Sequence, residues 1–129
     1  IGHFINGLSV AHEGRTQDVY NPATGIADKK VLLASKKTVQ EAINAAQAAF
    51  PAWRNTPVIK RARVMFKFKQ LLEDNAHHIA QLIGQEYGKI SHDAAGELQR
   101  GIENIEFACG APQLLKGVHS RNVEPGIDS

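Results

Sequence analysis

The clearest hydrophobic pattern in the chain predicts a helix over residues 90–110. Its apolar side chains recur at steps of four, three and four residues, the spacing that lines one face of an α-helix: Leu98, Ile102, Ile105 and Cys109. Ser91 or Asp93 can cap its start, and Gly110 suits the left-handed position that often follows a helix. Arg100 falls between the apolar positions, and at about 100° per residue it points away from their face.

Residues 1–34 show a β pattern instead. Asn6-Gly7 lies between short apolar runs and predicts a tight type I′ hairpin turn, because both residues tolerate a positive φ. Residues 18–20 are expected to be extended, and a turn over 21–25 joins them to a second strand candidate over 26–33. We therefore expect a β hairpin and further strands in this part of the chain.

A second amphipathic pattern follows Ser35. Ser35 or Thr38 can cap this helix, and Thr38 with Glu41 fits the spacing of a capping box. Its apolar positions are Val39, Ile43, Ala46 and Phe50. Pro51 lacks an N–H group and disfavours the helical conformation at the residue before it, so the helix should end or kink nearby. Trp53 is then expected to lie in a loop.

Two more helices are predicted before residue 90. Thr56 suits the cap of the first of them, and Pro57 suits its first position. Its apolar side is made of Val64, Phe68, Leu71 and Leu72. The helix after Asn75 is expected to bury Ala76, Ile79, Ala80, Ile83 and Tyr87. Gly88 ends that helix, and residues 112–116 are expected to add a last helical turn.

Together these patterns predict an α+β fold, with strands over 1–34 and four to five amphipathic helices over 35–117. Residues 118–129 carry a weak pattern and are expected to leave the domain as extended chain. The length of 129 residues suits one domain. The chain begins at Ile1 without a methionine and stops without a terminating element, so we expect a piece of a longer polypeptide.

The composition narrows the class of protein. Hydrophobic residues make up 43% of the chain and charged residues 22%, as in soluble globular proteins. A formal net charge of +2 is too small to indicate a nucleic-acid partner, and no apolar run approaches the ~20 residues of a membrane span. The single cysteine permits no internal disulfide and fits a reducing compartment. We expect a cytoplasmic protein that binds neither nucleic acid nor a membrane.

Four features could carry chemistry, and for each the sequence favours a structural role. Cys109 falls on the apolar stripe near a helix C-terminus, where the helix dipole disfavours a thiolate. His77 and His78 diverge by about 100° on a helix and have no ligand partner four residues away, so no metal site is expected. Gly84–Ile90 lacks the glycine spacing of a phosphate loop and the Ser or Thr that should follow Lys89. A basic run without an aromatic platform is expected to be a solvated face: Lys60, Arg61, Arg63, Lys67 and Lys69.

Arg100 is the remaining candidate. Glu97 and Glu103 each lie three residues from it, so an exposed ion pair worth roughly 0.2–0.5 kcal/mol is its simplest role. A guanidinium can instead bind the carboxylate of a ligand through two parallel hydrogen bonds. The spacing leaves both roles open.

The segment around Arg100 also resembles a known family. Residues 96–110, with Arg-Gly-Ile-Glu-Asn at 100–104, look like the matching helix of methylmalonate-semialdehyde dehydrogenases, the CoA-acylating branch of the aldehyde dehydrogenases. Phe-Ile-Asn-Gly at 4–7, Asn-Pro-Ala-Thr-Gly at 21–25 and Glu-Tyr-Gly-Lys at 86–89 resemble that family in the same order. The resemblance covers nearly the whole chain.

This resemblance implies an enzyme that oxidises a semialdehyde on a catalytic cysteine, reduces NAD and passes the acyl group to CoA. It also implies that Arg100 holds the carboxylate of the substrate and that Cys109 is not the catalytic thiol. The chain would be the N-terminal part of the α/β cofactor-binding domain of a homo-oligomer, with residues 118–129 leading toward its oligomerisation arm. The catalytic Cys, the Glu and the cofactor-binding motifs would lie beyond residue 129, so we expect no catalytic, cofactor-binding or metal-binding residue within the chain.

The resemblance therefore implies that the chain alone is inactive and binds neither NAD nor CoA. Its helices would then expose apolar surface, which invites self-association. The alternative is a free-standing helical binding or interaction module. A monomer that exposes no apolar surface would favour that alternative.

Overall fold

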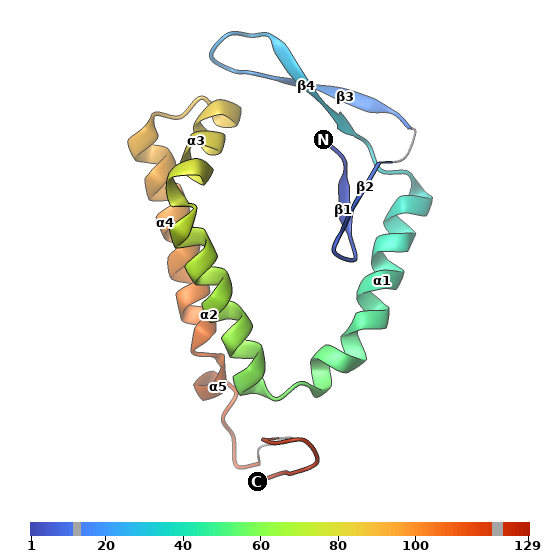
Figure 1. Cartoon of the computed structure of the whole chain (residues 1–129), viewed down its shortest axis with the longest axis vertical. Coiled ribbons are helices and arrows are strands. Elements are labelled where there is room, and N and C mark those ends of the chain that lie inside the picture. Colours follow the sequence, from blue (N-terminus) through green and yellow to red (C-terminus); the bar gives the residue numbers. More distant parts are fainter. Residues whose placement is uncertain (12–13, 120–122) are drawn as a thin grey trace. The chain divides into compact units, whose positions relative to one another are not determined.

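A computed structural model describes residues 1–11, 14–119 and 123–129. The chain divides into two units, Ile1–Ala52 and Trp53–Ser129. Among the described residues, the first unit holds the strands and most of the first helix, and the second holds the other helices (Figure 1). Short strands followed by helices confirm the predicted α+β class.

The first unit opens with the predicted hairpin. β1 (His3–Ile5) pairs antiparallel with β2 (Leu8–Val10), and Ile5 lies opposite Leu8. Asn6 has a φ of 52° and Gly7 a φ of 76°, so both turn residues take the positive φ that a type I′ turn requires. The Asn-Gly signal is confirmed.

A second hairpin joins β3 (Thr16–Tyr20) to β4 (Ala27–Leu32), again antiparallel, with a register shift between Val19 and Tyr20. The turn between them closes when the Gly25 N–H donates to the Asn21 carbonyl at 2.8 Å. Gly25 has a φ of 71°, which glycine adopts at little cost. The predicted strands over residues 1–34 are confirmed.

Helix α1 (Lys36–Asn55) begins at Ser35. The Thr38 N–H donates to the Ser35 Oγ at 3.1 Å, so Ser35 is the capping residue. Thr38 is buried inside the first turn, and its Oγ1 lies 2.9 Å from the Ser35 Oγ. The predicted capping box of Thr38 and Glu41 is wrong, because Thr38 occupies the third helical position instead of the cap.

Of the end or kink predicted near Pro51, the end does not occur at this residue, and the loop predicted for Trp53 is wrong. Pro51 lies inside the helix, and Trp53 belongs to its last turn rather than to a loop. A proline removes one backbone hydrogen bond, but the alanine-rich sequence around it has a high helix propensity. This propensity favours continuation of the helix past the proline.

In the second unit, α4 (Ser91–Cys109) packs against α2 (Val58–Asp74) and α3 (Ala76–Tyr87), and the short α5 (Ala111–Leu114) follows (Figure 1). The buried apolar side chains of the unit, among the described residues, are Ala62, Ala94, Ile102 and Cys109. Ala94 is 0% exposed and Ile102 4% exposed, while Leu98 and Ile105 are half-buried. The apolar stripe predicted for this helix is confirmed.

The ends of α4 differ from the prediction. Ile90 is its cap residue, whose carbonyl accepts from the Ala94 N–H at 3.0 Å, and neither Ser91 nor Asp93 caps it with a side chain. Gly110 has a φ of −77° rather than a left-handed value, because the chain passes directly into α5. The last helical turn thus starts one residue before the predicted range 112–116.

The predicted start of α2 is wrong, and the predicted end of α3 is confirmed. Pro57, rather than Thr56, is the cap residue of α2, because its ψ of 139° is extended and the helix begins only after it. Gly88 ends α3 as predicted, with a φ of 72°, and its N–H donates to the Gly84 carbonyl at 2.8 Å.

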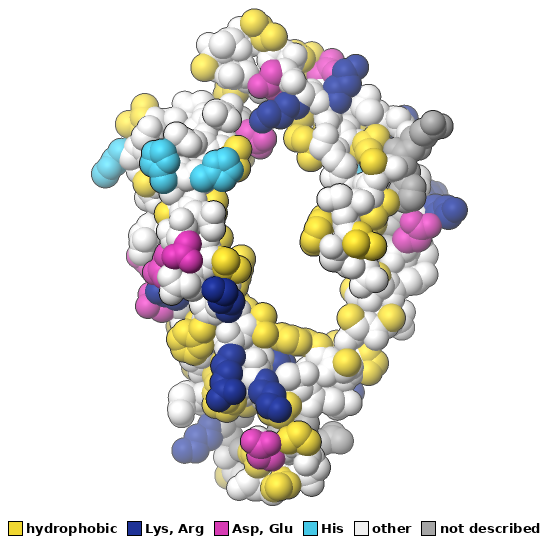
Figure 2. Space-filling model, in the orientation of Figure 1, with side chains coloured by type: hydrophobic (Ala, Val, Ile, Leu, Met, Phe, Trp, Pro, Cys, Tyr) yellow, Lys and Arg dark blue, Asp and Glu magenta, His cyan; other side chains and the backbone are white. Residues whose placement is uncertain are grey.

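The apolar side predicted for α2 is exposed over most of its length. Val64 is 53% exposed, Phe68 46% and Leu71 47%, whereas the packed side carries Ala62 and the half-buried Met65. The helix has two apolar stripes, and periodicity cannot say which of them meets a neighbour. Tyr87, predicted to be buried on α3, is also exposed. Figure 2 shows hydrophobic side chains at the surface in yellow.

The prediction of extended chain over residues 118–129 is wrong for the part after residue 122, which contains a turn. The Val123 N–H donates to the Ile127 carbonyl at 2.9 Å around a turn in which Gly126 has a φ of 78°. Residues 120–122 lie outside the described part. None of the helices described is long and apolar enough to cross a membrane.

Candidate functional site

Arg100 lies near the middle of α4 and is exposed, as predicted from its spacing. Its backbone carbonyl accepts a hydrogen bond from Asn104 Nδ2 at 2.9 Å. Within the described residues its guanidinium forms no ion pair and no hydrogen bond. The pairing with Glu97 or Glu103 that is its simplest role is therefore not formed: Glu97 pairs with Lys89, and Glu103 accepts from Gln99.

The Lys89–Glu97 pair connects the turn before α4 to the N-terminal half of that helix. Lys89 lies between α3 and α4, and its Nζ donates to the Glu97 Oε2. The same ammonium lies 5.7 Å from the centroid of the Tyr87 ring, within range of a cation–π contact. The sequence pattern does not reveal this pair, because the two residues are eight apart and separated by a helix boundary, where no periodic rule applies.

This contact lowers the pKa of Glu97. The hydrogen bond from Lys89 and then its positive charge lower the pKa of Glu97, and Arg100 lowers it further by a smaller amount. Because the pKa is lowered in the folded chain, the pair stabilises the fold above the ordinary Glu pKa. That stabilisation is lost as the pH falls through the lowered value.

A shallow hollow of about 340 Å³ lies beside Arg100, lined by Lys89, His92, Asp93, Gly96 and Arg100. Asp93, Gly96 and Arg100 follow at steps of three and four, so they share one side of α4. A Cβ added at Gly96 would meet no other atom within 4 Å, which shows that the missing side chain leaves open space. An unpaired guanidinium beside this space can bind a carboxylate.

The other candidate residues have structural surroundings. Cys109 is buried on the packed side of α4, which agrees with an inert thiol. His77 and His78 are both exposed on α3. No group of three or more potential metal ligands occurs within 1–11, 14–119 and 123–129.

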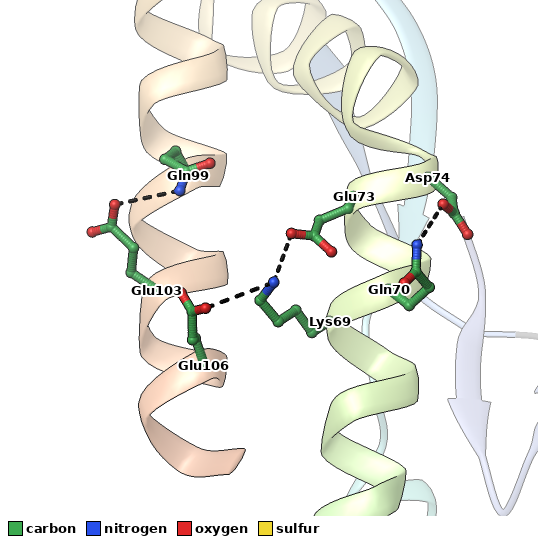
Figure 3. A network of polar contacts seen from close by, with 7 residues as sticks. All are labelled: Lys69, Gln70, Glu73, Asp74, Gln99, Glu103 and Glu106. Carbon is green, nitrogen blue, oxygen red and sulfur yellow. Dashed lines mark hydrogen bonds and ion pairs between the residues drawn. The ribbon is translucent and has the colours of Figure 1, made fainter. Parts of the chain in front are cut away.

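The basic run on α2 is not a uniformly solvated face, contrary to the prediction. Lys69 Nζ lies 2.7 Å from the Glu73 Oε1 and 3.8 Å from the Glu106 Oε1 of α4, so this lysine bridges two helices (Figure 3). The hydrogen bond to Glu73 is the main reason that the pKa of Lys69 is raised. Arg61 is half-buried, and its Nε has no hydrogen-bond partner among the residues described.

A sequence model of the aldehyde dehydrogenase family matches residues 9–128. The chain belongs to this family. Its sequence is 62% identical to the malonate-semialdehyde dehydrogenase of Pseudomonas aeruginosa over 127 residues, which are 98% of this chain and 26% of that enzyme. The chain thus spans about a quarter of the length of the aldehyde dehydrogenases that it matches.

Solved structures agree with this assignment. The methylmalonate-semialdehyde dehydrogenase of Oceanimonas doudoroffii is 68% identical, with a TM-score of 0.90 over 99% of this chain and 26% of that one. A protein of Sinorhizobium meliloti 1021, described as a methylmalonate-semialdehyde dehydrogenase and solved in complex with NAD, is 44% identical, with a TM-score of 0.88 over 98% of this chain and 26% of that one. The part that matches is the N-terminal part of an aldehyde dehydrogenase, as the sequence resemblance implied.

Proposed function

We propose that this chain forms the N-terminal segment, residues 1–129, of the cofactor-binding domain of an NAD-dependent, CoA-acylating dehydrogenase of malonate or methylmalonate semialdehyde. In this enzyme Arg100 binds the carboxylate of the substrate. The observation that supports this role is the unpaired guanidinium of Arg100 beside the hollow on α4. Both semialdehydes carry a carboxylate away from the reacting carbonyl, and an arginine fork suits that group.

The described residues do not themselves fit NAD. A dinucleotide site needs a strand that leads through a glycine-rich turn into a helix. The strands described here form antiparallel hairpins, and the turn that begins at Gly88 joins two helices. The proposal therefore assigns the binding of NAD and CoA, the catalytic Cys and the Glu to the part of the relatives that lies outside the matched quarter.

On this proposal the enzyme is a cytoplasmic homo-oligomer, residues 118–129 lead toward its oligomerisation arm, and the chain alone is inactive. Apolar side chains exposed on α2, such as Val64 and Phe68, fit packing against the rest of the enzyme. The competing function is a free-standing interaction module, which this exposed apolar surface does not favour. The two are separated by whether the chain supports catalysis when it is joined to the remainder of a dehydrogenase.

A chimaera tests the proposal. This chain replaces the matching quarter of the P. aeruginosa malonate-semialdehyde dehydrogenase, and NADH formation is followed with malonate semialdehyde, NAD and CoA. We expect an active chimaera, and no NADH from the chain alone, which should self-associate in light scattering. A folded chimaera without activity would contradict the proposal and favour the interaction module, whereas turnover by the chain alone would refute the assignment of the catalytic parts.

A substitution at Gly96 probes the hollow. Gly96→Ala adds a methyl group to a helix position with open space, so it should raise the free energy of unfolding by about 0.5–1 kcal/mol. In the chimaera the same methyl group occupies the lining of the hollow, and we expect kcat/KM for malonate semialdehyde to fall about tenfold. Gly101→Ala is the matched control, because its Cβ also meets no atom within 4 Å but lies outside the lining. Equal kinetics in the two variants would remove the hollow from the substrate site.

A further inference from the structure

The polar side of α4 carries a carboxylate, that of Glu97, which could pair with Arg100 in place of a substrate. Glu97 lies three residues before Arg100, a spacing at which Glu and Arg side chains on a helix form ion pairs. A carboxylate held there would occupy the guanidinium that the proposed substrate needs. Yet the Glu97 carboxylate is engaged by Lys89.

We propose that Lys89 is a positioning residue, which holds Glu97 away from Arg100 and so keeps the guanidinium available to the carboxylate of the substrate. This inference rests on the proposed role of Arg100. The Lys89 ammonium and the Arg100 guanidinium compete for the Glu97 carboxylate. When Lys89 binds this carboxylate, the guanidinium stays unpaired.

The backbone conformation after α3 places Lys89 close to Glu97. Gly88 ends α3 in the left-handed conformation, and the chain turns back along the helix. A Cβ at Gly84 would lie 3.2 Å from the Lys89 carbonyl, so the absence of a side chain at Gly84 permits this close approach. The Lys89 ammonium also lies 5.7 Å from the centroid of the Tyr87 ring, within range of a cation–π contact. Lys89 therefore approaches Glu97 from a fixed turn rather than from a freely moving surface.

The charges around Glu97 agree with this arrangement. Lys89 is the main cause of its lowered pKa, and Arg100 contributes a smaller part, so the carboxylate senses both cations but is bound to one. Asp93 and His92 also line the hollow beside Arg100. Asp93 is one helical turn further from Arg100 than Glu97 is, which leaves Glu97 as the nearer carboxylate on that side.

The pairing is tested on the chain itself by NMR titration of Glu97. In Lys89→Met we expect the pKa of Glu97 to stay below the ordinary Glu value, because Arg100 takes over the carboxylate. In Lys89→Met/Arg100→Met the pKa of Glu97 should return to the ordinary Glu value. If Lys89→Met alone restores the ordinary value, Glu97 does not turn to Arg100 and the inference fails.

The consequence for substrate binding is tested in the chimaera. Lys89→Met should lower kcat/KM for malonate semialdehyde roughly 2–5-fold through a higher KM, the effect expected when an exposed ion pair competes for Arg100. Oxidation of propanal, which has no carboxylate, should not change. Adding Glu97→Gln should restore the lost kcat/KM, because the competitor is then neutral. Lys69→Met, which breaks an ion pair remote from the hollow, is the control for loss of a lysine.

A double variant that stays impaired would show that Lys89 contacts the substrate itself or acts only through stability, and would overturn the inference. Failure of the proposed function looks different. In that case Arg100→Met affects malonate semialdehyde and propanal equally, while the titration of Glu97 still reports whether Lys89 controls the pairing.

Discussion

Arg100→Met in the chimaera should lower kcat/KM for malonate semialdehyde about 100-fold. The guanidinium forms no ion pair or hydrogen bond within the described residues, so the substitution breaks no such bond among them. What it removes is a bidentate, charge-assisted interaction with a carboxylate. Two hydrogen bonds of about 1.5 kcal/mol each give roughly 3 kcal/mol, which is close to the free energy of a 100-fold change in kcat/KM. Steady-state kinetics with malonate semialdehyde and with propanal measure the effect.

Propanal supplies the internal control, because it has no carboxylate and its kcat/KM should not change. Arg100→Lys keeps the charge but loses the planar fork, and we expect it to recover only part of the activity. A similar loss with both aldehydes would mean that Arg100 acts through the structure of α4. No loss with either would remove it from the substrate site.

The parts of the fold that could be predicted are those set by residues close together in the chain. The stripe through Ile102 and Cys109 follows from the helical repeat alone, and so does the outward direction of Arg100. The turn at Asn6-Gly7 follows from the ability of those two residues to adopt a positive φ. In each case one local rule decides the outcome, and no distant contact competes with it.

The errors arise where two local rules compete or where a distant partner decides. At Pro51 the loss of a hydrogen bond competes with the helix propensity of the alanines around it, and the helix continues. Helix α2 has two apolar stripes, and either could pack against the neighbouring helix. The stripe that does so contains the small, buried Ala62. The pair of Lys89 and Glu97 crosses a helix boundary, so no repeat could reveal it.

The candidate site shows the same division. The sequence indicates that Arg100 is exposed. It does not indicate that the guanidinium is unpaired, because Glu97 pairs with Lys89 instead, and this contact is seen only in the three-dimensional structure. The role of Arg100 toward a substrate stays a prediction. It draws on the resemblance to methylmalonate-semialdehyde dehydrogenases and on the unpaired guanidinium together, because neither an exposed arginine nor a family likeness alone specifies a contact.

The largest effect on stability is expected at Ile102, which is 4% exposed on the packed side of α4. Ile102→Ala removes buried apolar atoms and leaves a cavity that the neighbouring helices fill only in part. We expect the free energy of unfolding of the chain to fall by about 2–5 kcal/mol. Urea denaturation followed by far-ultraviolet circular dichroism measures this change. Ile59→Ala on α2 is the matched control, because Ile59 is 51% exposed and should change stability by no more than about 1 kcal/mol.

The difference in stability between the two isoleucine variants tests whether α4 is packed against its neighbours. Few side chains are fully buried among the described residues, so each buried apolar group on α4 supplies a large share of the stability of its unit. If Ile102→Ala and Ile59→Ala lower stability equally in the chain alone, α4 is not packed as described without further partners. If the difference then appears only in the chimaera, the remainder of the dehydrogenase is what holds α4 against α2 and α3, and Arg100 reaches its working position only in the whole enzyme.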